Sequence, residues 1–475
     1  MDSKVYFMDA RSSSPQTSLV AKMVTVFEAA GFDRLIKRGD MVAIKTHCGE
    51  WNNTAYLRPV YARTLADMVK ALGGRPFVCD TITLPYSIHS SRCTGLDFMV
   101  TAERNGYNSA TLGCPFIYAD GFMGTDDLRV DLPQGYILKE AYVAEAIAAA
   151  DILITLTHFK GHPEGVIGGA IKNLGIGAQS RRGKFNTHMG GHPKYGFGNN
   201  VFHPEKFKGK KNEQDWQILE ECCPFNLIHV TEDSINWERE KCTNCMACFG
   251  PMIKGGIVEL SDDNLRATNA AIADACLATV KTVGSGKVAF INLAVDISAA
   301  CDCITFADVP ILSHLGVFAS YDPVAIDKAC LDKALEAEGV RGSKADEMNV
   351  LDSGKHKFEA CSSMLEGLCE ETQLNVGEII GLGTRNYELV NVAEKNTGEF
   401  AFPPDQRPVG VRFQHLFAKL QPFPYNCYEG KGFLREKEVD LKRINAYYDP
   451  SQKLCKDEQG KKKKTSRKTR NSKSH

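Results

Sequence analysis

Hydrophobic positions in the first 160 residues alternate between the spacing of buried strands and that of amphipathic helices. Short apolar runs typical of strands occur at residues 5–8, 41–45, 76–79 and 152–154. Apolar residues at helical spacing lie between these runs, at residues 20–27 and 59–72. This β-α-β-α order predicts an α/β fold, with a mostly parallel sheet and covering helices.

The alternation is interrupted by a stretch that is rich in Gly, Asn, Lys and His and then in cysteine, which we interpret as an inserted module. The α/β pattern resumes with a helix up to Thr282, strands at 288–293 and 311–319, and a helix that begins at Asp322-Pro323. We therefore expect five segments: a first part of the α/β body at 1–190, the insert at 191–260, the second part of the body at 261–394, an irregular proline-bearing extension at 395–460 and a basic tail at 461–475.

The composition is typical of a soluble globular protein, with 43% hydrophobic and 24% charged residues. The most apolar stretch, residues 141–157, is interrupted by two acidic residues, so we do not expect membrane insertion. The first residues do not resemble a secretory signal. Seventeen cysteines in a chain of this length favour metal ligation in a reducing cytoplasm over a disulfide framework.

Charge is spread unevenly along the chain. The last fifteen residues carry eight Lys and Arg and no acid, so the net charge of −1 leaves −9 on residues 1–460. An acidic body is not the profile of a nucleic-acid-binding domain. We therefore expect no nucleic acid as a partner, apart from a contact that the tail could make with RNA or an acidic protein. A tail that is only solvated is the simpler interpretation.

The most specific chemical signal is three cysteines at C-x2-C-x2-C spacing, Cys242, Cys245 and Cys248. Bacterial ferredoxins use this spacing, followed by C-P, to wrap a tight loop around a [4Fe-4S] cluster. The fourth cysteine of that signature would stand at position 252, where this chain has Met252. The motif therefore needs a fourth ligand from elsewhere.

Cys223, which precedes Pro224, is the candidate for that fourth ligand. In two-cluster ferredoxins the cysteine before the proline binds the other cluster. The chain has no cysteine at 200–221 and none at 252, so the ligands of the second cluster are missing while one complete set remains. We predict one [4Fe-4S] cluster on Cys223, Cys242, Cys245 and Cys248, with the neighbouring Cys222 as the substitute for Cys223. A zinc site with four cysteine ligands, or plain thiols, are the alternatives.

Polar side chains follow three of the predicted strands and form a candidate active site. Ligands of α/β proteins gather at the carboxyl ends of parallel strands. The candidate catalytic residues are His47, Glu50, His158, Lys160, His162 and Lys172. The candidate cofactor-binding residues are Gly168, Gly169, Lys172 and Asn173. The competing interpretation is that His47 and Glu50 only satisfy a loop, and that the histidine and glycines around Pro163 only shape a turn.

Cys301 and Cys303 form a C-x-C pair, which could bind a soft metal as a second site or act as a redox thiol pair. Two ordinary thiols in a turn are equally compatible with the pattern. Cys276 and Cys330 lie within helical patterns, and we expect them in the core. Glycine motifs for dinucleotides or nucleoside triphosphates are not evident.

Several short segments together resemble the iron–sulfur-centre proteins of the domain-of-unknown-function 362 family, in the branch with a ferredoxin-type insert. The similar segments are residues 42–47, 49–50, 56–59, 80–81, 113–115, 119–121, 156–162, 168–173, 301–303, 322–327 and 381–385. The resemblance implies an α/β protein with iron–sulfur redox involvement and no assigned reaction. Typical members carry two complete ferredoxin motifs, whereas this chain keeps one. More faintly, the segment from His162 to Lys172 is similar to the histidine–lysine segment of lactate racemases.

These observations lead to three hypotheses on function. The first is an oxidoreductase or electron-transfer component of anaerobic metabolism, in which a single cluster serves a pocket in the α/β body. It would need a redox partner protein and a small-molecule substrate. The second is a non-enzymatic, ferredoxin-like electron carrier or assembly partner. The third is an enzyme that depends on a metal cofactor, is related to lactate racemase and has a merely structural cluster.

Overall fold

The computed structural model describes residues 3–85, 90–209, 216–362 and 368–394, together with residues 435, 436, 438, 439 and 441. The chain divides into two compact units, residues 1–406 and 407–475. Nearly all described residues belong to the first unit, and the following paragraphs concern that unit alone. Most of the predicted extension at 395–460 and all of the predicted tail at 461–475 lie outside the described residues.

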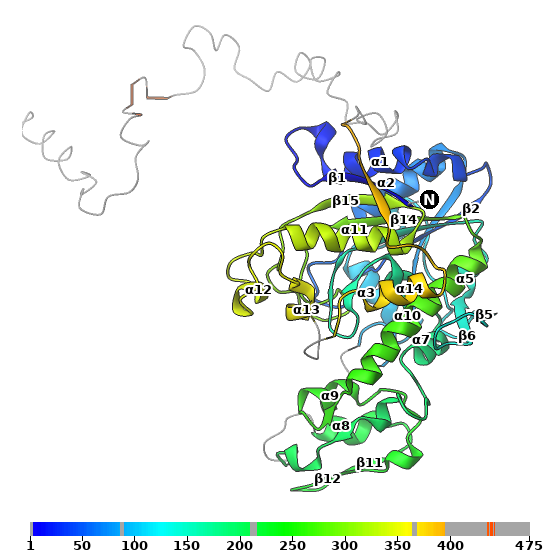
Figure 1. The fold of residues 1–475 in the computed structure, drawn as a ribbon, viewed down its shortest axis with the longest axis vertical. Coiled ribbons are helices and arrows are strands. Elements are labelled where there is room, and N and C mark those ends of the chain that lie inside the picture. The colour runs from blue at the N-terminus through cyan, green and yellow to red at the C-terminus, as the bar shows by residue number, and fades with distance from the viewer. Residues whose placement is uncertain are drawn as a thin grey trace, which may run out of the picture. The chain divides into compact units, whose positions relative to one another are not determined.

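An eight-stranded sheet forms the centre of the first unit, in the order β16-β1-β15-β14-β7-β2-β3-β4 (Figure 1). Its strands are β1 (Ser3–Asp9), β2 (Met41–Lys45), β3 (Arg75–Asp80), β4 (Phe116–Tyr118), β7 (Ile152–His158), β14 (Val288–Ala294), β15 (Gly316–Ser320) and β16 (Tyr387–Asn391). All neighbouring strands are parallel except those that flank β15, which runs antiparallel to β1 and β14. The predicted α/β class with a mostly parallel sheet is therefore confirmed.

Helices cover both faces of this sheet because alternate strand residues point to opposite faces. Val42 and Ile44 of β2 belong to one buried cluster, together with α1 (Leu19–Ala29) and α2 (Pro59–Ala71). Ala43 belongs to a second cluster on the other face, together with α10 (Asp262–Val283) and α11 (Pro323–Glu336). In Figure 1, α1 and α2 lie above the sheet, and α11 and α10 lie below it. Both faces are thus removed from solvent, as a parallel sheet requires.

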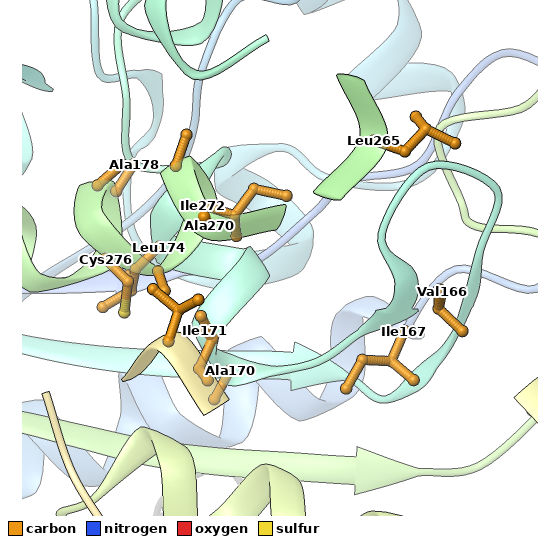
Figure 2. Packing of buried hydrophobic residues seen from close by; sticks show 14 of the residues in the cluster. Val166, Ile167, Ala170, Ile171, Leu174, Ala178, Leu265, Ala270, Ile272 and Cys276 are labelled. Atoms are coloured by element: carbon orange, nitrogen blue, oxygen red, sulfur yellow. The ribbon is translucent and has the colours of Figure 1, made fainter. Parts of the chain in front are cut away.

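The short helix α6 (Ala170–Gly175) carries two of the candidate site residues and is held by close packing against α10. A side chain at Gly175 would bring its Cβ within 2.1 Å of the Ile272 carbonyl oxygen, so only glycine fits there. Ile171, Leu174 and Cys276 belong to the same buried cluster, shown in Figure 2. Cys276 and Cys330 are fully buried, as predicted.

One predicted strand begins later than expected. The pattern predicts a strand at residues 311–319, but β15 starts at Gly316. Before that, Leu312 makes only an isolated bridge to Gly339, and the His314 ring accepts the Asp296 N–H at 2.9 Å. The apolar run is buried against loops and not in a ladder, a difference that hydrophobicity cannot reveal.

The described part of residues 191–260 contains two short antiparallel ribbons, two short α-helices and three 3-10 turns. The ribbons pair β10 (Val201–Phe202) with β13 (Val258–Glu259) and β11 (Ile228–Val230) with β12 (Ile235–Trp237). The helices are α8 (Trp216–Cys222) and α9 (Phe249–Lys254), both labelled in Figure 1. The content is α+β, and the ferredoxin-like character of this insert stays a prediction.

Other described helices are α3 (Gly95–Arg104), α4 (Ser109–Leu112), α5 (Glu145–Ala148), α7 (Arg181–Thr187), α12 (Lys344–Glu347), α13 (Lys357–Ser362) and α14 (Thr372–Ile379). Two further hairpins pair β5 (Asp127–Asp131) with β6 (Glu140–Ala144) and β8 (Lys160–His162) with β9 (Val166–Gly168). Across the described ranges, no helix has both the length and the apolar character that a bilayer-spanning segment needs.

Candidate functional site

Polar residues gather where the adjacent parallel strands β3, β2, β7 and β14 end. Lys45, at the end of β2, lies opposite Cys79 of β3 and Thr155 of β7. Asp80 and His158 close their own strands at the same edge. We call this the strand-end site: Lys45, His47, Glu50, Asp80, His158, Lys160, His162, Lys172, Cys301, Asp302 and Cys303. Its place agrees with the general rule for ligand sites in α/β sheets.

The first part of the strand-end site is a buried network around Asp80. The Asp80 carboxylate lies 3.0 Å from Lys45 Nζ and 2.8 Å from His47 Nδ1. Burial by itself would raise the pKa of Asp80, but the charges of Lys45 and His47 hold it well below its usual value. The carboxylate is therefore ionised and fixes the orientation of both partners.

His47 presents one ring nitrogen that is chemically available. Its Nδ1 faces the ionised Asp80 and therefore carries the hydrogen, which leaves a lone pair on Nε2. This Nε2 is buried and has no hydrogen-bond partner. Burial and the nearby Arg92 charge lower the pKa of His47 to about 4, so the ring is neutral near pH 7. The arrangement suits a metal ligand or a general base.

A second network surrounds Asp302, a buried residue that sequence reasoning missed although it lies inside the C-x-C motif. Its carboxylate lies 2.9 Å from His158 Nδ1 and 3.1 Å from Lys160 Nζ. The other His158 nitrogen faces the Val295 carbonyl oxygen at 2.7 Å. Asp302 and the Val295 carbonyl oxygen thus contact both ring nitrogens of His158, so neither nitrogen is directed toward a ligand. In this structure His158 positions Asp302.

Glu50 is buried, and other residues already occupy its carboxylate. Arg92 Nε lies 3.1 Å from Oε2, and the Trp51 N–H donates to Oε1 at 2.9 Å. Ser91 also donates to Oε1 through its hydroxyl and its N–H. The Glu50 N–H donates to the Asp302 carbonyl oxygen at 2.8 Å, which ties this loop to the C-x-C loop. These contacts favour the satisfied-loop interpretation of Glu50 over an acid–base role.

Two basic side chains near the C-x-C loop have pKa values far below their usual values. Burial, and then the charges of Lys172 and Lys160, lower the pKa of His162 well below its usual value. Burial and the Lys160 charge also lower the pKa of Lys172 to about 7. Among the residues that the structure describes, the Lys172 amine has no hydrogen-bond or ion-pair partner. An amine that is partly neutral at pH 7 can act as a base or a nucleophile.

The predicted cofactor-binding glycines have different surroundings. A Cβ at Gly169 would come within 2.4 Å of the Asp327 carboxylate, whereas a Cβ at Gly168 would make only an ordinary contact, 3.5 Å from Lys160 Cε. Asp327 accepts hydrogen bonds from the Ala170 and Ile171 N–H groups at 2.7 and 2.9 Å. A carboxylate of the protein thus already occupies the start of α6. The predicted residue Asn173 accepts from Lys45 Nζ at 3.0 Å.

A third buried pair close to Asp80 was also missed. Lys184 Nζ donates to Thr81 Oγ1 and to the Gln179 carbonyl oxygen, both at 2.6 Å. Burial lowers the pKa of Lys184 to about 8 and raises that of Asp120 to about 6. Lys184 lies on α7, far from the strand ends in sequence, and no local pattern could have pointed to it.

In the insert, the four predicted cluster cysteines line one cavity. The cavity measures about 310 Å³ when its open mouth is included, and Cys223, Cys242, Cys245 and Cys248 all line it. Its remaining wall is mostly apolar and is formed by Phe197, Phe225, Leu227, Ile228, Trp237, Thr243, Met246 and Ala247. Cys222 does not line this cavity, and its thiol donates to the Leu219 carbonyl oxygen at 3.3 Å.

The spacing of these sulfurs bears on which metal centre they suit. Among the described residues, three groups of His, Cys, Asp or Glu have ligand atoms that all lie within 4.8 Å of one another: His162/Cys301/Cys303, His47/Cys48/Asp80 and His356/Glu359/Glu370. None of them includes the insert cysteines. Four sulfurs around one zinc would stand about 4 Å apart, given Zn–S bonds of about 2.3 Å. In every trio of the insert cysteines, at least one sulfur–sulfur distance therefore exceeds 4.8 Å.

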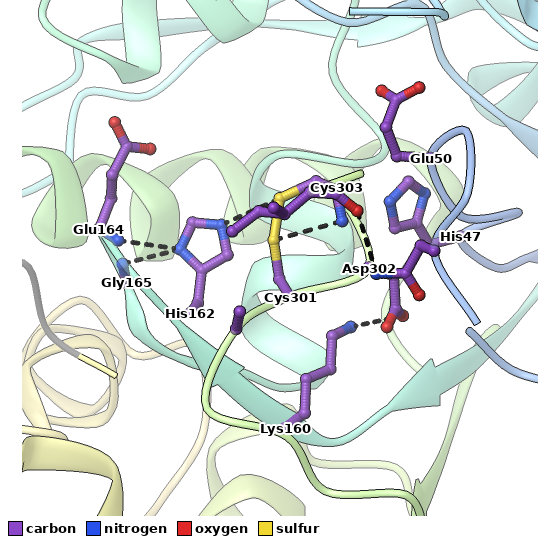
Figure 3. Close-up of a disulfide and its surroundings, with 12 residues drawn as sticks. His47, Glu50, Lys160, His162, Glu164, Gly165, Cys301, Asp302 and Cys303 are labelled. Atoms are coloured by element: carbon purple, nitrogen blue, oxygen red, sulfur yellow. Dashed lines mark hydrogen bonds and ion pairs between the residues drawn. A yellow bond between two sulfur atoms is a disulfide. The ribbon is translucent and has the colours of Figure 1, made fainter. Parts of the chain in front are cut away.

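The second predicted cysteine site is a disulfide between Cys301 and Cys303. It faces His162, whose Nε2 lies 3.7 Å from Cys303 Sγ (Figure 3). The same three residues form one of the groups that could hold a metal ion. The structure thus brings the C-x-C pair together with His162, Lys160 and, through Asp302, His158.

A family model matches more than half of the chain. Residues 42–332 match a family model described as domain of unknown function (DUF362). No curated protein matches the chain. Among solved structures, the chain is similar to the lactate racemase apoprotein from Thermoanaerobacterium thermosaccharolyticum, with a TM-score of 0.30 and 11% sequence identity. This similarity covers 62% of the chain and 51% of that protein, so it spans about half the length of the racemase.

Proposed function

The chain belongs to the family of the domain of unknown function DUF362, and from this premise we propose that it is an iron–sulfur oxidoreductase or electron-transfer component. In this proposal Cys223, Cys242, Cys245 and Cys248 bind a single [4Fe-4S] cluster. The observation that supports it is the shared cavity, because cysteines that are up to 25 positions apart in sequence line one space. In a cubane each thiolate binds a different iron, so the sulfurs stand farther apart than around one ion.

The surroundings of the cavity suit a redox centre. The Leu227 N–H points at Cys223 Sγ and the Asn244 N–H at Cys242 Sγ, each at 3.3 Å. Hydrogen bonds to thiolate sulfur and a partly apolar wall are the means by which proteins adjust cluster potentials. Asn244 and Met246 have left-handed backbone conformations, which turn the loop tightly between the three cysteines of the motif.

The strand-end site would bind the small molecule that takes part in the reaction. Two of its groups are available for this, the lone pair on His47 Nε2 and the Lys172 amine, since neither has a partner among the described residues. Their chemistry favours a substrate that carries a carboxylate or another anionic group beside the reacting carbon. The electron donor or acceptor is proposed to be a protein that approaches the cavity beside Phe225, whose side chain is 54% exposed.

The decisive experiment is anaerobic purification of the full chain, with quantification of iron, inorganic sulfide and zinc. We expect about four irons and four sulfides per chain, together with an electron paramagnetic resonance signal after reduction. Cys223→Ser should lose most of the iron. Cys222→Ser is the matched control, because its sulfur lies next in sequence but does not line the cavity, and it should keep the iron.

Two results would contradict the proposal in different ways. Zinc without inorganic sulfide in oxygen-protected protein would refute the cluster and the redox function together. Loss of iron in Cys222→Ser with retention in Cys223→Ser would keep the cluster but exchange its fourth ligand.

A further inference from the structure

The Cys301–Cys303 disulfide lies on the loop that follows β14, and this loop is firmly held. The Asp302 side chain, between the two cysteines, is fully buried in its ion pairs with His158 and Lys160. The Asp302 carbonyl oxygen accepts the Glu50 N–H at 2.8 Å. Because the side chain of Asp302 anchors the loop, its two neighbours present their sulfurs away from that anchor, toward His162 (Figure 3).

The two sulfurs differ in accessibility and each has its own hydrogen-bond donor. Cys301 is 2% exposed, whereas Cys303 is half-buried. The Cys303 N–H points at Cys301 Sγ at 3.3 Å, and His162 Nε2 lies 3.7 Å from Cys303 Sγ. Donors of this kind stabilise a thiolate when the bond between the sulfurs is opened.

The orientation of His162 decides between metal binding and thiol chemistry. Its Nδ1 accepts hydrogen bonds from the Gly165 N–H at 2.9 Å and the Glu164 N–H at 3.2 Å, so Nδ1 carries no hydrogen. The hydrogen of the neutral ring is then on Nε2, the atom that faces Cys303. A metal on Nε2 would leave the ring without any hydrogen, which is unfavourable. The turn that imposes this tautomer is tight, since Val166 has a left-handed backbone with φ of 61°.

We propose that Cys301 and Cys303 form a reversible redox disulfide that exchanges with external dithiols, with Cys303 as the sulfur that is attacked and His162 as its hydrogen-bond donor. This activity is separate from the proposed cluster.

Reduction of the disulfide takes two displacements at sulfur. A thiolate of the external dithiol attacks Cys303 Sγ, so a mixed disulfide forms and the bond to Cys301 Sγ breaks. The electron pair of that bond leaves on Cys301 Sγ, where the Cys303 N–H stabilises it until it takes a proton. The second thiolate of the reagent then displaces Cys303 and closes the reagent as a disulfide. Two electrons and two protons pass from the dithiol to the protein.

The test uses the full chain in anaerobic buffers with set ratios of reduced to oxidised dithiothreitol, followed by alkylation and mass spectrometry of the peptide that holds both cysteines. The doubly alkylated fraction should follow the ratio as a two-electron equilibrium. In Cys301→Ser the remaining Cys303 should react with an aromatic disulfide at least about tenfold faster than Cys301 does in Cys303→Ser, because Cys303 is the more accessible sulfur. Alkylation of this peptide does not depend on bound iron, so the measurement tests the disulfide independently of the proposed [4Fe-4S] cluster.

Paired variants of His162 test its role without simply removing the turn. In the Cys301→Ser background, His162→Asn keeps an acceptor for the Gly165 N–H but cannot reach Cys303, so Cys303 should react more slowly and at a higher pH. His162→Gln keeps a donor that reaches the sulfur and should restore part of the rate. The proposal is overturned if the pair stays fully alkylated at every reagent ratio. It is also overturned if the purified protein holds one zinc per chain that His162→Asn releases, because that result assigns a metal site.

Discussion

Gly169→Ala tests whether this predicted cofactor-binding glycine is needed for a ligand or for packing. Its added Cβ would lie 2.4 Å from the Asp327 carboxylate, well inside van der Waals contact. The carboxylate would have to move away from the donors that it now accepts, namely Ala170, Ile171 and Asn292, at 2.7 to 2.9 Å.

The size of the effect follows from those hydrogen bonds. Each hydrogen bond to a buried charged group contributes about 1.5–3 kcal/mol, and losing two of them should lower the free energy of unfolding by about 3–6 kcal/mol. Asp327→Ala removes the same acceptor and should cost about as much. It also removes the atoms that the new methyl group would meet. In the Asp327→Ala background, Gly169→Ala should therefore cost less than about 1 kcal/mol.

The assay is urea unfolding followed by circular dichroism for both single variants and the double variant. The double-mutant cycle should give a coupling energy of about 2–5 kcal/mol between positions 169 and 327. Gly168→Ala is the matched control, since its Cβ would meet nothing closer than 3.5 Å, and it should leave stability nearly unchanged. Additive costs would refute the packing argument. Unchanged stability of Gly169→Ala combined with loss of a bound cofactor would support a ligand at this glycine.

Three further results are expected. Folding lowers the pKa of His47 from about 6.5 to about 4, so the unfolded chain binds more protons than the folded chain between these pH values. The free energy of unfolding should therefore fall by up to about 3 kcal/mol as the pH drops from 6.5 to 4. Urea unfolding of His47→Gln should lack this fall, and an unchanged pH dependence in the variant would contradict the lowered pKa of His47. Lys172 should be labelled by acetic anhydride with an apparent pKa of about 7 in peptide mapping, and titration near the ordinary lysine value of about 10.4 would show that it is well solvated. Removal of iron with an oxidant and a chelator should make residues 191–260 sensitive to protease, while the sheet stays resistant. The reason is that metal centres stabilise the segments that bind them. Equal cleavage with and without iron would argue against a cluster bound by residues 191–260.

Local patterns account for most of the elements of this fold. The strand pattern at residues 41–45 and the helical pattern from Pro59 predict β2 and α2 almost to the residue, because side-chain periodicity and a proline at a helix start are local properties. The same patterns could not reveal that β15 runs antiparallel between β1 and β14. Strand direction depends on the pairing partners, and these are far away in sequence.

The candidate site divides in the same way. Short stretches of sequence contain the spacing of Cys242, Cys245 and Cys248 and the polar residues that follow the strands. Both features could therefore be predicted from the sequence. The Cys-Pro pair also predicted Cys223 as the fourth ligand, but only the folded structure shows that Cys223 lines the same cavity. Asp302 and Lys184 were missed because nothing in their neighbouring residues marks them as buried charges.

The order of residues along the chain specifies which reactive side chains occur and which strands they follow. What each of these side chains can do depends on its surroundings in the folded protein. His47 keeps a free lone pair because Asp80 takes its other nitrogen, whereas His158 is occupied on both sides by Asp302 and a carbonyl oxygen. The physical reason is that protonation, tautomer and availability depend on the neighbours that folding brings within hydrogen-bond distance, and these come from distant parts of the chain.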